Sequence, residues 1–367
     1  MVKKNERDHL IRLYEESLKN LILKFERLLK EGRKINHEAY LLKELQRSFE
    51  EIKKQKKIIQ MTLNDEYINR KIKEIERAIK VSDVEIKYDY KQFTKIDTDN
   101  VIQLYKIFND KTRKAEKGIG RQIQEFFSDQ EKRATSELNS FIRDELVSRE
   151  LGKSKKEAIA SLTEKLRDNL YFTLRTETGK KIRMSLPAYA KMNLNTMFQQ
   201  AKNTASIQAV KDTGSKLVKF SSHYWTCETC AMYAEGRVYT LDRRIKKYPY
   251  LYDIPGFNKG YKSIHPNCKH LLSGYYEEGH SKKEVEENKK LSENQEDNRS
   301  SDMIKKYETR QEINRLERVK NSINAKLQTL RGANLTEEER GMISVLNRRK
   351  KEIIKKINSL RDNFRGL

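Results

Sequence analysis

Glycine and proline are scarce in this sequence, with 14 and 4 residues in a chain of 367. Average proteins devote roughly 12% of their residues to these two types, so turns must be few here. Sandwiches and barrels need turn residues in quantity, and a collagen-like chain needs glycine at every third position, so these classes are excluded. Hydrophobic residues make up 36% of the chain, below the roughly 45–50% of compact globular domains. Long helices with charged outer faces fit this composition best.

Long apolar runs are also missing. No segment approaches the roughly 18–20 apolar residues that a membrane-spanning helix requires, so we expect no membrane span. The first residues, MVKKNERDHL, are charged and lead into no apolar core, which predicts no secretory signal. There are only three cysteines, two of them spaced as C-x-x-C. This usage indicates metal or redox chemistry in a reducing cytoplasm rather than a disulfide framework.

Positive charge is abundant, since 78 Lys and Arg oppose 54 Asp and Glu for a formal net charge of +24. Such an excess indicates an acidic partner, most often nucleic acid, although a solvated helix surface is the alternative. From Arg340 onward there are nine basic and two acidic residues. The run of Arg348, Arg349, Lys350 and Lys351 is the candidate nucleic-acid contact. Binding to phosphates there would be independent of sequence and sensitive to salt.

Apolar residues recur at helical spacing on both sides of the chain's centre. The stripe of Ile11, Tyr14, Leu18, Leu21, Phe25 and Leu28 has the narrow seam of a coiled coil. Further stripes cover 42–63 and 68–79, so we predict a helical hairpin over 1–95 and a helical domain over 96–175. Stripes between 316 and 360 predict a second hairpin, which together with a polar linker forms residues 281–367.

Residues 176–280 have a different composition and are predicted to form a small α+β Cys/His module. Alternating residues around Thr178-Gly179 predict a short β-hairpin, a helix should run from Ser185 to about Thr213, and residues 217–220 should form a strand. All three Cys, three of the four Pro and four of the six His lie in 221–280. The fold class is therefore mainly α, with elongated helical hairpins or coiled-coil segments flanking a small zinc-binding α+β module.

Two close-spaced pairs of metal ligands lie in this module. Cys227-x-x-Cys230 supplies two thiolates, and His265-x-x-Cys268 supplies an imidazole and a third thiolate. These are the preferred ligands of zinc, and four of them would make a closed, structural site. The insert of 34 residues over 231–264 is longer than in a usual zinc ribbon.

Two other histidines and two other roles for the cysteines stay open at this point. His270 is an alternative to His265, and His223 is a more distant candidate. The cysteines could instead form a redox pair or fill apolar space. Signatures of zinc deaminases, metalloproteases, Walker loops, dinucleotide-binding loops and serine hydrolases are all missing from the sequence. We therefore expect no enzymatic activity.

The order of motifs between residues 189 and 270 is informative as a whole. The motifs are Tyr189-Ala190-x-Met192, Val218 with Ser221-Ser222-His223, Cys227-x-x-Cys230, Gly236-Arg237-Val238-Tyr239 and His265-Pro266-Asn267-Cys268-Lys269-His270. This order resembles the minor capsid proteins of tailed bacteriophages of Gram-positive bacteria, within the wider Mu F-like head morphogenesis group. The resemblance covers roughly residues 120–330.

The resemblance implies a low-copy structural protein of the virion, made in the host cytoplasm. Its partners would be the phage portal and major capsid proteins and double-stranded DNA without sequence preference, at the portal vertex and capsid interior. Some relatives lack the cysteines, which implies that a structural zinc stabilises the fold. Several relatives end the second pair with Cys-x-Cys where this chain has Cys268-x-His270, so the resemblance does not decide which histidine completes the site.

Two alternatives come from other functional classes. A zinc-dependent nuclease or effector carried in the phage head is suggested by the cluster over 265–270 and by toxin-like domains fused to some relatives. Those fusions are usually extra C-terminal domains, whereas this chain ends in a predicted helical hairpin. A nucleic-acid-binding coiled-coil protein unrelated to phage would explain the charge but not the cysteine module.

Overall fold

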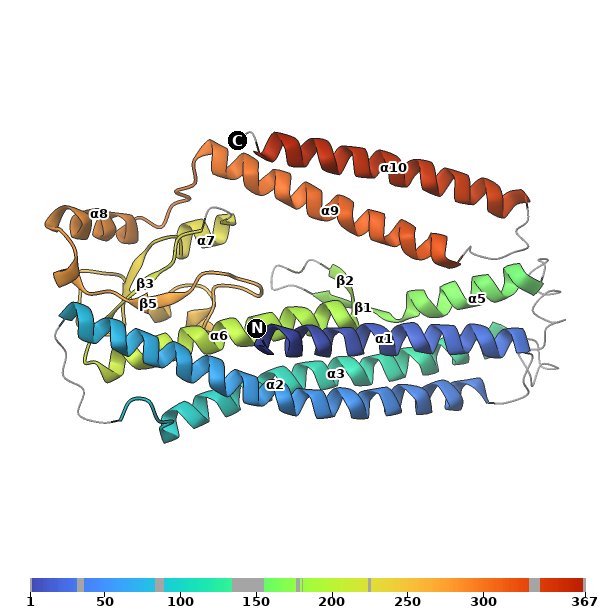
Figure 1. The fold of residues 1–367 in the computed structure, drawn as a ribbon, viewed down its shortest axis with the longest axis horizontal. Helices are drawn as coiled ribbons and strands as arrows, with labels where there is room; N and C mark the ends of the chain where they lie inside the picture. The colour runs from blue at the N-terminus through green and yellow to red at the C-terminus, as the bar shows by residue number, and fades with distance from the viewer. Residues whose placement is uncertain are drawn as a thin grey trace.

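The long axis of the molecule is set by a layer of long helices (Figure 1). The computed structural model describes residues 2–31, 36–82, 89–133, 155–175, 179, 181–223, 226–329 and 337–365. The layer contains α1 (Val2–Glu31), α2 (His37–Ser82), α3 (Lys95–Arg133), α5 (Lys155–Asn169) and α6 (Leu186–Asp212). The described part of the chain is mainly helical, as the sequence predicts, and none of its helices is long and apolar enough to cross a membrane.

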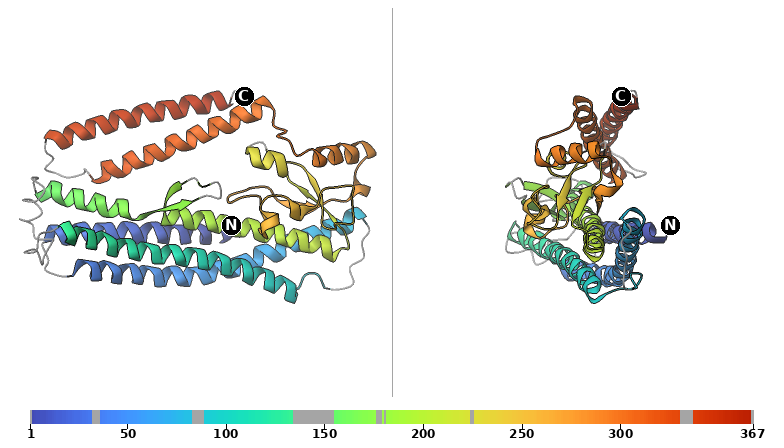
Figure 2. Two further views of the ribbon diagram at one scale, coloured as in Figure 1. Left: turned by 180° about the vertical axis from the view of Figure 1, so that it is seen from behind. Right: turned by 90° about the vertical axis from the view of Figure 1, so that its left-hand side faces the viewer.

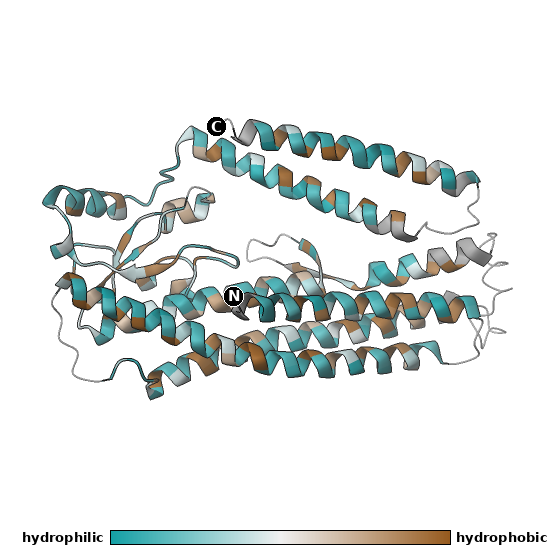
Figure 3. Cartoon of the chain, viewed as in Figure 1, coloured by the Kyte–Doolittle hydropathy of each residue, from teal (hydrophilic) through white to brown (hydrophobic). Residues whose placement is uncertain are grey.

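Hydrophobic residues recur along each helix of this layer (Figure 3), and most residues of the predicted stripes are buried or partly buried. All six residues of the first stripe are buried, and one hydrophobic cluster joins α1, α2, α3, α5 and α6. The stripes over 42–63 and 68–79 lie on one continuous helix, α2. Lys56, which interrupts the stripe, is buried and lies 2.7 Å from Glu116 of α3, which also accepts a hydrogen bond from Tyr14 of α1. A polar contact therefore joins three helices beside the apolar cluster.

The Cys/His module is built on a small antiparallel sheet at one end of α6 (Figures 1 and 2). Its elements are β3 (Leu217–Phe220), α7 (Glu228–Tyr233), β4 (Val238–Thr240) and β5 (Leu272–Gly274), with strand order β4-β3-β5. The predicted hairpin is also present, as β1 (Tyr171–Arg175) paired with β2 (Lys181–Ser185). The predicted helix from Ser185 and the predicted strand at 217–220 correspond to α6 and β3.

Three further helices complete the chain. After the module come α8 (Lys282–Glu293), α9 (Ser301–Thr329) and α10 (Glu337–Arg365). The last two form the predicted hairpin with a small apolar cluster of their own, which includes Leu316, Ile323, Ile353 and Ile357. The hairpin lies above the long-helix layer in Figure 1. The boundaries predicted at 95, 175 and 280 stay predictions, and so does the coiled-coil character of the seams.

A buried ion triad ties the long helices together where the module begins. The Lys71 Nζ of α2 lies 2.8 Å from Asp97 Oδ2 at the start of α3 and 2.9 Å from Asp212 Oδ2 at the end of α6. The side chains of Lys71 and Asp97 are completely buried. Asp97 also accepts hydrogen bonds from the backbone N–H and the hydroxyl of Thr94, which closes the first turn of α3. The triad fixes the relative positions of three helix segments.

Replacing the central cation of this triad should be costly. We expect Lys71→Met to lower the free energy of unfolding by about 3 kcal/mol or more, because two carboxylates then face each other with no buried cation between them. Lys73→Met, which replaces an exposed residue of the same helix, should change the free energy of unfolding by less than about 0.5 kcal/mol. Denaturant unfolding of both variants tests this, and equal midpoints would contradict it.

The same triad predicts acid sensitivity. Burial raises the pKa of Asp97, but the hydrogen bonds from Lys71 and Thr94 outweigh it and hold the pKa below its usual range. A lowered folded-state pKa gives stability that is present above the unfolded pKa of about 3.9 and is lost as the pH falls through the folded value. We therefore expect the melting temperature to fall below about pH 4, and to fall less steeply in Asp97→Asn. A melting temperature that falls equally with pH in the wild-type protein and in Asp97→Asn would contradict this.

Candidate metal centre

The first two cysteines are positioned by the short helix α7. Cys227 is its N-cap residue and Cys230 lies in its first turn, so both thiols lie on the same side of the helix. The helix stands beside an antiparallel sheet rather than in the parallel βαβ unit of common thiol oxidoreductases. This context favours a structural or metal-binding pair over a redox pair.

The remaining candidates lie on the loop that leads into β5. Pro266 and Asn267 form the centre of a tight turn, in which the Cys268 N–H donates to the His265 carbonyl at 3.1 Å. Asn267 has a φ of 62°, a left-handed conformation that asparagine tolerates better than most residues. The turn brings the His265 and Cys268 side chains to the same place. His270 follows two residues later, just before β5.

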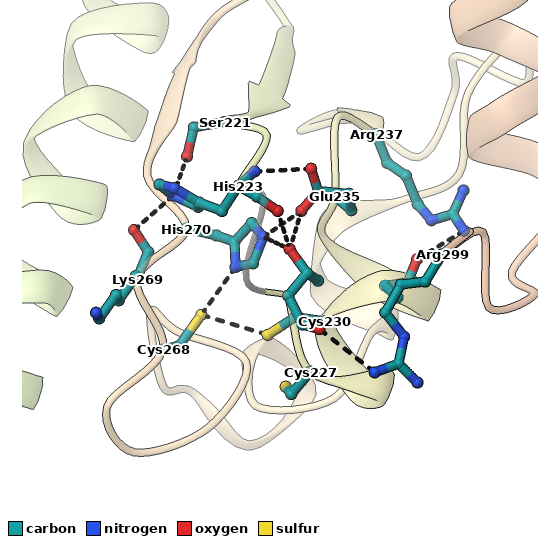
Figure 4. Close-up of polar contacts among 12 residues, drawn as sticks. Ser221, His223, Cys227, Cys230, Glu235, Arg237, Cys268, Lys269, His270 and Arg299 are labelled. Carbon is teal, nitrogen blue, oxygen red and sulfur yellow. Dashed lines mark hydrogen bonds and ion pairs between the residues drawn. The ribbon is translucent and has the colours of Figure 1, made fainter. Parts of the chain in front are cut away.

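The structure brings these side chains together into one cluster, of which Figure 4 shows the three cysteines and His270. The His265 Nε2 lies 3.2 Å from the Cys227 Sγ and 3.1 Å from the Cys230 Sγ. The Cys230 Sγ lies 3.6 Å from the Cys268 Sγ, which is 3.7 Å from the His270 Nδ1. Tetrahedral zinc with bonds of about 2.3 Å to sulfur and 2.0 Å to nitrogen has ligand-to-ligand edges of roughly 3.5–3.8 Å. Two groups that could hold a metal ion overlap here and share Cys230.

Hydrogen bonds orient both imidazoles as metal ligands. The Nδ1 of His265 lies 2.7 Å from the Pro266 carbonyl oxygen, and the Nε2 of His270 lies 2.8 Å from the Glu235 carboxylate. Both partners only accept hydrogen bonds, so each of these nitrogens carries the proton. In the neutral form of each ring, which a bound cation would favour, the opposite nitrogen directs its lone pair at the thiols, as in metal sites where a second partner fixes the tautomer.

Ionisation of all three thiols is electrostatically unfavourable without a cation between them. Hydrogen bonds with the other two thiols, together with burial, raise the pKa of Cys230, while the hydrogen bond to Cys230 lowers the pKa of Cys227 and of Cys268. The hydrogen bond with Cys227 raises the pKa of His265 to about 9. Three thiolates this close repel one another, whereas a divalent cation between them would favour all three. The donor set could therefore hold a metal ion.

Glu235 is a supporting residue that the sequence did not single out. It accepts hydrogen bonds from the His270 ring, from the Thr226 hydroxyl and, at 2.7 Å, from the His223 backbone N–H. Burial raises its pKa, but these bonds outweigh burial and leave the pKa below its usual range. The carboxylate is thus ionised and holds His270 in place. In the sequence there is only a weak sign of this role, which is that Glu235 is an acidic residue next to Gly236 in a module rich in Cys and His.

His223, the third histidine considered, is outside both ligand groups. Its Nε2 lies 3.0 Å from the Ser221 Oγ and 3.1 Å from the Lys269 carbonyl oxygen, and its ring packs edge-on against His270. It supports the loop rather than facing the thiols.

Uncharged side chains of α6 hold the ligand loop, which the sequence analysis also missed. The Gln199 amide donates to the His270 carbonyl at 2.5 Å, and the Thr196 hydroxyl accepts from the Asn267 N–H at 3.3 Å. The Asn203 amide donates to the Lys262 carbonyl and accepts from the Leu272 N–H. The sequence signal for these contacts was the four-residue spacing of Gln199 and Asn203 on one predicted helix, since polar side chains that become buried need hydrogen-bond partners.

Helix α2 contacts β5, the strand that follows the ligand loop. The Arg70 guanidinium donates to the Leu272 carbonyl at 2.7 Å, and the Glu74 carboxylate accepts from the Gly274 N–H at 3.0 Å. These contacts join residues about 200 positions apart in the chain. The module is thus fixed to the long-helix layer through β5, next to the candidate ligands.

The candidate nucleic-acid contacts lie far along the chain from this cluster, on α10. Arg348, Arg349 and Lys351 are exposed, whereas Lys350 is half-buried. Nothing in the geometry tests whether they bind DNA, so that assignment stays a prediction.

Comparison with known proteins places these features in one family model. The model described as phage minor capsid protein 2 matches residues 4–340. The match runs from α1 through the Cys/His module to the start of α10. No curated protein and no solved structure matches the chain.

Proposed function

The chain belongs to the phage minor capsid protein 2 family, and from this premise we propose that it is associated with the portal vertex in the capsid interior and contacts the packaged DNA. Family membership confirms the resemblance found in the sequence. The protein is a structural component of the virion, and its partners are other virion proteins. The single observation that carries the proposal is the match over residues 4–340.

The charge and the shape of the protein support the proposed contacts with DNA and with the capsid. An elongated layer of helices with a net charge of +24 suits a protein that lies between protein shell and DNA. The exposed residues Arg348, Arg349 and Lys351, with Lys350, would neutralise phosphates without reading bases. The portal and major capsid proteins are the proposed protein partners.

The metal centre supports a structural role over the nuclease or effector alternative. We propose that zinc is held by Cys227, Cys230, Cys268 and His265, with His270 as the alternative histidine. Three thiolates and an imidazole fill a tetrahedral site, whereas hydrolysis needs a position open to water. The bound ion would fix α7 to the loop before β5. The proposed function therefore includes no catalytic step.

Particle composition tests this proposal. Mature particles and DNA-free precursor particles of the phage would be purified, digested and quantified by mass spectrometry after chemical cross-linking. We expect the protein in both, at a low copy number relative to the major capsid protein, with cross-links to the portal protein. Absence from both kinds of particle would overturn the assignment, and cross-links only to the shell would overturn the portal contact.

A further inference from the structure

Three exposed cations gather on one face of α3. Lys114, Lys117 and Arg121 lie at positions i, i+3 and i+7 of the helix and are exposed. Among the described residues, none of the three forms an ion pair or hydrogen bond. Like charges at this spacing destabilise a helix by a few tenths of a kcal/mol each. The stripe is therefore unfavourable by itself and would be relieved by an anion from outside the chain.

The neighbouring helix shows the opposite arrangement. On α2, Arg47 pairs with Glu44, Lys53 with Glu50 and Lys54 with Glu51. Each pair is formed within the helix at a spacing of three residues, so the positive charge is balanced locally. These three exposed cations of α2 are thus balanced within the helix, whereas Lys114, Lys117 and Arg121 are not.

Two glycines interrupt the same part of α3 without a structural reason. Gly118 and Gly120 lie inside a 39-residue helix, and a methyl group at either position would meet nothing within 4 Å. Neither has the positive φ that would require glycine. Glycine inside a helix costs about 1 kcal/mol relative to alanine. The absence of a side chain at these positions leaves the helix backbone open to close approach by a ligand.

One of these glycines opens a hollow beside the cations. The hollow has a volume of about 570 Å³ and is lined by Leu42 of α2 and by Lys114, Lys117, Gly120, Arg121 and Gln124 of α3. Gly118 is not part of its lining. We call this feature the α2–α3 hollow. Its donors are three cations and one amide, all from one face of a single helix.

We propose that the α2–α3 hollow binds the phosphate backbone of double-stranded DNA. The three cations span about 10.5 Å along the helix axis, and one strand of B-DNA carries a phosphate every 3.4 Å of axis, so about three phosphates match them. No aromatic side chain lines the hollow, so it offers no stacking platform for the bases of a single strand. The inference rests on the proposed contact with packaged DNA and assigns to it a surface distinct from residues 348–351.

Salt-dependent binding of the full-length protein to a random 30-base-pair duplex tests this assignment. The triple variant Lys114→Gln, Lys117→Gln, Arg121→Gln should flatten the slope of log affinity against log salt concentration by about 2–3. The matched control Arg47→Gln, Lys53→Gln, Lys54→Gln removes the same charge from α2 and should flatten it by less than about 1. Equal slopes for the two triple variants would overturn the assignment of DNA binding to the α2–α3 hollow, while DNA binding by the protein as a whole would still stand. If the wild-type protein binds no duplex at low salt, the DNA contact in the proposed function fails as well.

The glycines give an independent test in which stability and binding separate. Gly118→Leu and Gly120→Leu should both raise the melting temperature, because leucine favours the helix and a Cβ at either position meets no neighbour within 4 Å. Only Gly120→Leu fills the hollow, so it should weaken DNA binding about tenfold, while Gly118→Leu leaves it unchanged. Equal affinities of the two variants would overturn the role of the hollow.

Discussion

Removal of the proposed metal ion is expected to unfold the Cys/His module while most of the long helices stay helical. A structural zinc contributes its binding energy directly to folding, about 10–16 kcal/mol in zinc-finger peptides. Chelator or Cys268→Ser should therefore lower the melting temperature by about 10 °C or more. Hydrogen exchange should rise over residues 226–280, because the ligand loop also anchors β5.

The controls for this prediction separate ligands from their neighbours. His223→Gln should keep the metal, since His223 hydrogen-bonds Ser221 and Lys269 outside the two ligand groups. Elemental analysis of His265→Ala and His270→Ala identifies the fourth ligand as the histidine whose loss abolishes stoichiometric zinc. Identical melting curves with and without chelator would contradict the structural role.

Replacement of Arg237 is the second change expected to have a large effect. This side chain is completely buried, and its guanidinium donates to carbonyl oxygens of Met232 at 2.7 Å, Ala231 at 2.9 Å and Glu296 at 2.7 Å, and also to that of Leu291. It thereby joins the end of α7 to the end of α8. Burial lowers the pKa of Arg237. Each carbonyl that loses its donor in a buried site costs about 1–3 kcal/mol.

We therefore expect Arg237→Met to lower the free energy of unfolding of the module by about 4 kcal/mol or more. Arg237→Lys should rescue little, since an ammonium group cannot reach four carbonyls as a planar guanidinium does. Arg244→Met is the matched control, because Arg244 is exposed and only pairs with Asp242, and should cost less than about 1 kcal/mol. Denaturant unfolding followed by exchange over 226–296 measures all three. A near-neutral Arg237→Met would contradict the role of this contact.

The motif around Arg237 shows how far local sequence can predict structure. The order Gly236-Arg237-Val238-Tyr239 helped to identify the family, but not what the residues do. Gly236 has a φ of 68°, and a Cβ there would lie 3.0 Å from the Ser222 Oγ. The Val238 N–H donates to Ser292 of α8 at 2.8 Å. These partners lie far away in the chain, so spacing alone could not reveal them.

Helical periodicity and close-spaced ligand pairs were the reliable signals in this sequence. Periodicity predicted the buried face of α1, because a helix repeats its contacts every three to four residues. The run Ser185-Leu186-Pro187 predicted the start of α6. The pairs at 227–230 and 265–268 predicted the cysteine cluster, because metal ligands must converge. The ion triad of Lys71, Asp97 and Asp212 could not be predicted, since its members look like ordinary surface charges until three helices meet.

The interaction with the portal protein is the most direct test of the proposed place of this protein in the virion. The chain would be co-expressed with the portal protein of the same phage and analysed by size-exclusion chromatography with mass determination. We predict co-elution at a fixed stoichiometry of fewer chains than portal subunits. Complete separation of the two proteins at low and at physiological salt would contradict a position at the portal vertex.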